Sequence, residues 1–218
     1  MQDVGRTIGR TGWGLRSLLL AGVASSVLIA PAEALTIVPT YSALVTASAK
    51  TAFAFAAGEY QTLFTDPVQV NIQVNANGGG LGSSSTPIAG IFSYAQVRTA
   101  LINDYATDPS AARTIATGAG GSINTTTDPS TTGRYFIARA EEKALKLIAS
   151  DAVNDGTFTY NGGLSYTFDP NNRMVAGKFD FIGVAEHEIS EIMGRIPGLG
   201  GTIGGSAGFL PPGLTPGV

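Results

Sequence analysis

The 218-residue sequence predicts an α+β fold in which long helices pack on a twisted mixed β-sheet. Residues 68–75 alternate apolar and polar side chains without error, which is the pattern of a strand with one buried face. Residues 136–149 and 181–194 instead repeat apolar side chains with the period of an amphipathic helix. One clear strand and two clear helices therefore indicate a mixed domain.

Residues 1–34 predict a cleaved secretory signal peptide. Three arginines precede an apolar run over residues 18–30, and Ala32-Glu33-Ala34 supplies an A-x-A cleavage site. A retained membrane anchor is the alternative, but the run is shorter than the ~20 apolar residues that span a bilayer. We therefore expect cleavage after Ala34 and a secreted or cell-surface protein with no stable membrane anchor.

The mature chain, residues 35–218, has the length of one domain and is large enough to bury a core. The sequence contains no cysteine, which excludes disulfides and cysteine-ligated zinc. The formal charge of the whole chain is −3, and removal of the three arginines and two acidic residues of the signal segment leaves −4. This acidic balance gives no indication of a nucleic-acid partner.

The first half of the mature chain predicts a strand, a helix and a second strand. Residues 35–39 are expected to form the first strand and residues 42–64 the helix, which Asp66-Pro67 ends. After the strand at 68–75, the glycines and serines of residues 77–85 predict a flexible loop. A phosphate-binding loop is the alternative, but no Gly-Lys-Ser/Thr sequence follows.

The second half predicts further short elements before the last helix. Residues 88–92 are expected to form a strand and residues 94–105 a helix, whereas residues 107–133 form a surface loop with one short helix at 111–116. Residues 136–149 are expected to form an amphipathic helix. Its predicted exposed side carries Glu141, Glu142, Lys143 and Lys146.

Two short strands around Asn161-Gly162-Gly163 predict a β-hairpin. Residues 157–160 and 164–168 are both rich in Thr, Phe and Tyr, and the Asn-Gly pair between them favours a tight turn. Asp169-Pro170 closes the unit.

The helix predicted at residues 181–194 separates an apolar stripe from a polar face. At 100° per residue, His187 and Glu191 fall together opposite the stripe, and Glu188 lies about 60° from Glu191. The apolar stripe comprises Ile182, Ala185, Ile189, Ile192 and Met193.

This helix carries the sequence Glu186-His187-Glu188-Ile189-Ser190-Glu191, which contains the only histidine of the chain. It has the form of an H-E-x-x-H zinc-protease helix in which Glu191 replaces the second histidine. His187 and Glu191 share a face and would both ligate Zn²⁺, and Glu188 would act as the base for a water. An anionic ligand makes the metal a weaker Lewis acid. The alternative is an ordinary His-Glu pair on a surface helix.

At these residues the chain resembles a known family. Residues 179–195 resemble the active-site helix of metzincin-like zinc proteases, and more closely that of exported bacterial metalloprotease-like proteins with an H-E-I-x-E helix, many of which bear a PEP-CTERM sorting tail. The resemblance implies a zincin-like domain over residues 35–196, with this helix near the C-terminus. It further implies His187 as a metal ligand, Glu188 as the general base and Gly194 as a turn glycine.

The resemblance also implies that substrate lies extended along an edge strand, for which residues 157–160 are the candidate. Pro197 stands where metzincins have a third ligand, and proline offers none. Asp155, Asp169 and Asp180 are candidates because they lie near the helix in sequence. A histidine with carboxylates would suit Mn²⁺ or Ca²⁺ at least as well as Zn²⁺.

Taken together, the sequence predicts a secreted zinc-dependent metallopeptidase that hydrolyses a peptide or protein substrate. Two alternatives stay open: a non-catalytic exported or surface protein that retains a degenerate zincin fold, and a truncated remnant. The second follows from residues 197–218, a Gly/Pro-rich tail without His, Asp, Glu or Cys, in which the chain stops.

Overall fold

A computed structural model describes residues 35–107, 127–128 and 133–196. The expected signal peptide at 1–34, the short helix at 111–116 and the tail at 197–218 lie outside these residues. Among the residues that are described, no helix is both long enough and apolar enough to cross a membrane.

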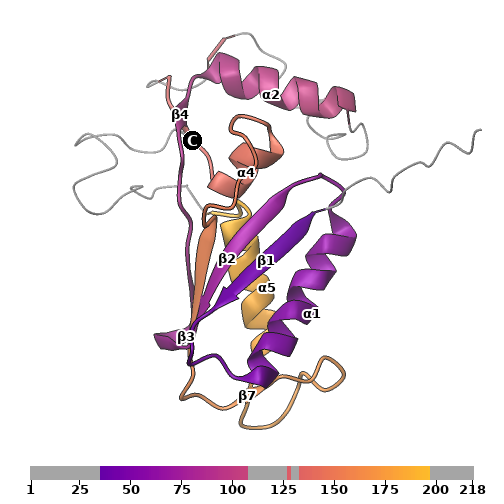
Figure 1. The fold of residues 1–218 in the computed structure, drawn as a ribbon, viewed down its shortest axis with the longest axis vertical. Helices are drawn as coiled ribbons and strands as arrows, with labels where there is room; N and C mark the ends of the chain where they lie inside the picture. The colour runs from indigo at the N-terminus through magenta and orange to yellow at the C-terminus, as the bar shows by residue number, and fades with distance from the viewer. Residues whose placement is uncertain (1–34, 108–126, 129–132, 197–218) are drawn as a thin grey trace, which may run out of the picture. The chain divides into compact units, whose positions relative to one another are not determined.

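A four-stranded mixed sheet forms the centre of the fold (Figure 1). Its strands follow the order β1 (Thr36–Tyr41), β2 (Gln69–Asn75), β6 (Gly156–Asn161) and β3 (Asn77–Ser85). The first three strands are parallel, whereas β3 runs antiparallel to β6 and is the terminal strand. The predicted α+β class with a mixed sheet is therefore confirmed.

Helices α1 (Ala47–Leu63) and α5 (Phe181–Ile192) pack against each other and against one face of this sheet (Figure 1). The alternation predicted for β2 places Val70, Ile72 and Val74 on that face, fully buried, while the polar residues between them lie on the other. Aromatic rings fill the layer between, with the ring centres of Tyr160 and Phe181 4.9 Å apart. The predicted helices at 42–64 and 181–194 and the strand at 68–75 are thus present.

Residues 77–85, expected to form a loop, are instead strand β3. Backbone hydrogen bonds to β6 do not depend on side chains, and the register pairs Ser83 with Thr159 and Ser84 with Phe158. Small side chains also suit this strand because α5 passes close beneath it: a Cβ on Gly82 would lie 2.5 Å from Val184 Cγ1. The prediction of a loop was wrong because it used local composition alone.

The predicted hairpin is also wrong. Strand β6 lies inside the sheet between β2 and β3, so residues 157–160 are not an edge strand. The next strand, β7 (Tyr166–Thr167), pairs in parallel with β8 (Phe179–Asp180). The apolar side chains of β6 explain the difference, since Phe158 and Tyr160 are core residues that are buried between the sheet and the helices.

The helix predicted at 136–149 is limited to α4 (Arg139–Ala144), which Lys146 follows with a left-handed φ of 56°. Glu142 and Lys143, expected to be exposed, are buried. Glu142 accepts hydrogen bonds from the backbone of Ala89 and Gly90, both at 3.0 Å, and Lys143 Nζ lies 2.7 Å from Asp155 Oδ2. Burial of these charges is possible because each has a partner distant in sequence.

Three further elements complete the described part of the chain. Helix α2 (Tyr94–Thr107) confirms the helix predicted at 94–105. Strands β4 (Ile91–Phe92) and β5 (Tyr135–Phe136) form a separate antiparallel pair, so the strand expected at 88–92 is present but shorter.

Candidate functional site

Helix α5 has the two faces that the sequence predicts. Ile182, Ala185, Ile189 and Ile192 are fully buried in the core. On the other side, 56% of the His187 side chain is exposed to solvent. The helix ends where predicted, because Gly194 adopts a φ of 115° that side chains rarely tolerate.

The structure brings His187 and Glu191 together. His187 Nε2 lies 3.1 Å from Glu191 Oε1, as expected for side chains four residues apart on one helix. The other carboxylate oxygen, Oε2, accepts a hydrogen bond of 2.5 Å from the Ser84 hydroxyl of β3. Glu191 is therefore held between the helix and the terminal strand of the sheet.

Glu188 lies beside this pair, almost fully buried at 6% exposure. It packs beneath β3, where a Cβ on Gly82 would lie 2.9 Å from Glu188 Oε1. Burial raises the pKa of the Glu188 carboxyl above its ordinary value; Glu191 raises it further, while Ser84 and His187 act in the opposite direction. A carboxylate with a raised pKa is a stronger base than one in open solvent.

Arg195, just after Gly194, folds back onto the exposed side of His187. Its Nη2 lies 3.2 Å from His187 Nδ1, 3.2 Å from the His187 carbonyl oxygen and 3.9 Å from Glu191 Oε1. Its Nε donates to the Ser190 hydroxyl at 2.6 Å. A guanidinium therefore lies next to both of the predicted metal ligands.

A pocket of about 460 Å³ opens beside His187 and Glu188, between β3 and the first half of α5. It is in the size range of ligand-binding pockets. Its remaining lining residues are mostly apolar or small and comprise Leu81, Gly82, Phe179, Asp180, Gly183 and Val184. The Glu188 carboxylate thus borders a space that is large enough for a small chemical group.

The other end of α5 is fixed by polar contacts from α1 and from the loop that contains Arg173. Arg173 binds both oxygens of Glu186, at 3.0 and 2.9 Å, and Asp180 Oδ2 at 2.7 Å. The Tyr60 hydroxyl of α1 donates to the Glu186 carbonyl oxygen at 2.7 Å. Glu186, which adjoins the motif in sequence, is thus a structural residue that holds the helix in place.

The candidate third ligands do not join the pair. Asp155 is buried against Lys143 and Arg139, Asp180 is bound by Arg173, and Asp169 accepts from the backbone of Asn171. Across residues 35–107, 127–128 and 133–196, no three His, Cys, Asp or Glu side chains converge on one point.

The two donors that do converge fit a divalent cation. Ligand atoms about 2.0–2.2 Å from a tetrahedral ion lie roughly 3.3 Å from each other, close to the 3.1 Å between His187 Nε2 and Glu191 Oε1. One imidazole and one carboxylate would suit Zn²⁺ or Mn²⁺. The described residues could therefore hold such an ion through two ligands, His187 and Glu191.

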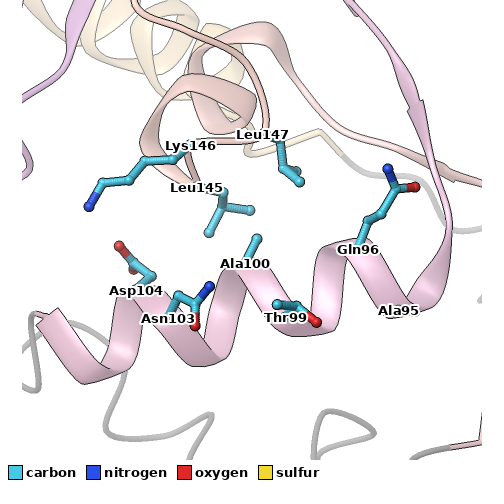
Figure 2. Close-up of a pocket in the computed structure, with 9 residues that line it drawn as sticks. All are labelled: Ala95, Gln96, Thr99, Ala100, Asn103, Asp104, Leu145, Lys146 and Leu147. Carbon is cyan, nitrogen blue, oxygen red and sulfur yellow. The ribbon is translucent and has the colours of Figure 1, made fainter.

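A second pocket, of about 530 Å³, lies between α2 and the turn after α4 (Figure 2). Asp104 and Lys146 face it from opposite walls, among the small and apolar side chains of Ala100, Leu145 and Leu147. Asp104 is the one carboxylate among its lining residues, which include no histidine.

The sequence motif predicted His187, Glu188 and Glu191 as candidate site residues, but it did not predict the contacts of Ser84 and Arg195 with them. Ser84 carried no local signal, because it lies in a Gly/Ser run that resembles a loop. Comparison with family models, curated proteins and solved structures finds no match for the chain.

Proposed function

We propose that this protein is an exported metal-dependent peptidase with a zincin-like architecture. The observation that carries the proposal is the juxtaposition of His187 and Glu191, with donor atoms 3.1 Å apart, and the buried Glu188 carboxylate beside a pocket. The resemblance of residues 179–195 to zinc-protease helices supports the same function, as does the position of β3 as the terminal strand next to α5.

His187 and Glu191 would hold the cation. Such a cation, Zn²⁺ or Mn²⁺, would supply Lewis-acid polarisation of the scissile carbonyl and acidify a water molecule. Glu191 is kept in position by Ser84, so that its Oε1 remains directed at His187.

Glu188 is the proposed general base and acid. It takes a proton from the attacking water as the water oxygen bonds to the carbonyl carbon. It then gives that proton to the amide nitrogen as the C–N bond breaks. The raised pKa of Glu188 favours the first step, because it makes the carboxylate a stronger base than that of an exposed glutamate.

The substrate is proposed to bind in extended form along β3. A terminal strand presents unpaired backbone groups that can add a peptide by main-chain hydrogen bonds. The pocket lined by Leu81, Phe179 and Val184 would then receive one apolar side chain of the peptide. This assignment replaces residues 157–160 as the candidate edge, since β6 is paired on both sides.

Metal content and peptide hydrolysis test the proposal. The purified chain, reconstituted with Zn²⁺ and desalted, is examined by mass spectrometry and assayed on a library of quenched fluorescent peptides. We expect about one bound ion per chain in the wild type, loss of the ion in His187→Ala, and a retained ion without hydrolysis in Glu188→Gln. Asp169→Asn is the matched control, because Asp169 is an exposed carboxylate outside the site and asparagine can accept the same hydrogen bond from the Asn171 backbone. A wild type that binds no ion would refute the proposal.

A non-catalytic exported or surface protein that retains the architecture is the second candidate. The observation that favours it is that the described residues supply two ligands rather than the usual three. It predicts no hydrolysis of any peptide in the library, with or without added metal. Hydrolysis that depends on both His187 and Glu188 would exclude it.

A further inference from the structure

We infer that the positive charge of Arg195 lowers the affinity of the His187 and Glu191 pair for a cation. This inference rests on the proposed function. Its basis is that Arg195 Nη2 lies 3.2 Å from His187 Nδ1 and 3.9 Å from Glu191 Oε1.

The contact with Arg195 determines which nitrogen of the His187 ring carries the hydrogen. A guanidinium has only donors, so the Arg195 contact makes His187 Nδ1 an acceptor. In the neutral ring the hydrogen then lies on Nε2, which donates to Glu191 Oε1 at 3.1 Å. Ligation through Nε2 needs the opposite tautomer, whose Nδ1–H usually donates to a carboxylate, a carbonyl or water. Arg195 offers none of these.

Arg195 also offsets the negative charge of Glu191. Glu191 is the anionic ligand, and a guanidinium near its Oε1 compensates the charge that would attract a cation. A divalent ion held by the same oxygen would lie a few ångströms from this positive group. At surface dielectric values, such repulsion lowers the affinity by about tenfold.

Hydrogen bonds at the end of α5 hold Arg195 in this position. Gly194 turns the chain back at the end of α5, and the backbone N–H of Arg195 donates to the Ser190 carbonyl oxygen at 2.9 Å. The Ser190 hydroxyl accepts from Arg195 Nε and donates to the His187 carbonyl oxygen, each at 2.6 Å. Arg195 is therefore held over His187 by the helix terminus, with 54% of its side chain exposed.

Zinc affinity measured by competition with a chromogenic chelator tests the inference, with the wild type, Arg195→Gln and Arg195→Gln/His187→Ala compared in one buffer. We expect Arg195→Gln to bind Zn²⁺ about tenfold more tightly than the wild type, and the double variant to lose the site. Because exposed charges are screened by salt, the gain is expected to shrink between ~0.05 and ~1 M NaCl.

Arg134→Gln is the control, since it removes the same charge from an exposed position before β5. It is expected to bind zinc as the wild type does. An Arg195→Gln affinity no higher than that of the wild type, or no higher than that of Arg134→Gln, overturns the inference while leaving the cation site intact. Zinc binding that is equal in His187→Ala and in the wild type overturns the proposed site itself, and the inference with it.

Discussion

The Glu188 carboxyl lies beneath β3, where burial raises its pKa. The folded state therefore holds the Glu188 proton more tightly than the unfolded chain does. Stability falls as pH rises from the ordinary carboxyl pKa to the raised one, and the whole loss is present above the raised value. An ionised Glu188 is thus a local cost to folding in the metal-free protein at neutral pH.

Glu188→Gln is expected to remove that cost. In chelator-treated protein at pH 7, the variant should be more stable than the wild type by about 0.5–2 kcal/mol, the usual size of a single stabilising substitution. The gain should vanish near pH 4, where the wild-type carboxyl is also protonated. Urea unfolding at both pH values measures it. A variant less stable than the wild type at pH 7 would contradict this account of the Glu188 environment.

Gly82 is the point of β3 at which α5 leaves no room for a side chain. A Cβ there would lie 2.5 Å from Val184 Cγ1 and 2.9 Å from Glu188 Oε1, so β3 or α5 must move to accept it. We expect Gly82→Ala to destabilise the protein by about 1–3 kcal/mol in urea unfolding, as overpacking does.

Gly80→Ala is the matched control for Gly82→Ala. Gly80 lies on the same strand, and a Cβ on it would meet no atom within 4 Å. It should leave stability within about 0.5 kcal/mol of the wild type. Equal effects of the two substitutions would indicate that β3 and α5 are not in close contact.

At the scale of elements, the sequence predicted those whose stability comes from their own periodicity. Helix α5 and strand β2 bury the side chains that their patterns indicate, and the spacing of four residues places Glu191 on the His187 face. The periodicity of the helix was therefore enough to predict that His187 and Glu191 lie side by side.

The elements that the sequence missed depend on partners far along the chain. Strand β3 contains few strand-forming residues, and its pairing with β6 joins residues more than 70 positions apart. The Asn161-Gly162 turn signal was overridden because the apolar side chains of β6 belong to the core. Ser84 and Arg195 were not predicted for the same reason. A sequence pattern does not show that β3 passes next to Glu191, or that the chain turns back at Gly194.

Helix α4 illustrates how a distant partner reverses a prediction. Lys143 and Asp155 are both fully buried as side chains, 2.7 Å apart, and Arg139 Nε lies 3.2 Å from the other Asp155 oxygen. Lys143 also donates to the Gln69 carbonyl oxygen at 3.1 Å, which connects α4 with the start of β2. The Lys143 charge of α4 therefore faces the sheet instead of the solvent.

Lys143→Met is expected to destabilise the protein by roughly 3–5 kcal/mol, because it leaves Asp155 buried without its nearest cation. Urea unfolding followed by circular dichroism measures the loss. Lys178→Met, at an exposed lysine, should change stability by no more than about 0.5 kcal/mol. A loss below 1 kcal/mol for Lys143→Met would mean that Arg139 alone compensates Asp155.

At the scale of the whole domain, α5 connects the sheet, α1 and the segment before β8. Glu191 binds Ser84 of β3, the Glu186 carbonyl accepts from Tyr60 of α1, and the Glu186 side chain binds Arg173. An ion bound at His187 and Glu191 would therefore stabilise the folded state, in which these contacts hold the two side chains together. Cation binding and global unfolding are expected to be coupled.

Zinc should raise the unfolding temperature, by an amount that grows with the logarithm of the free zinc concentration above Kd. At a free concentration of 100 times Kd, binding to the folded state alone adds ~2.7 kcal/mol, which corresponds to a rise of roughly 5–10 °C for a domain of this size. Differential scanning fluorimetry should show the rise in the wild type and in Glu188→Gln, and a chelator should reverse it. His187→Ala should show no rise, because its Glu191 is left as a single ligand. An equal rise in His187→Ala would place the stabilising ion elsewhere in the chain.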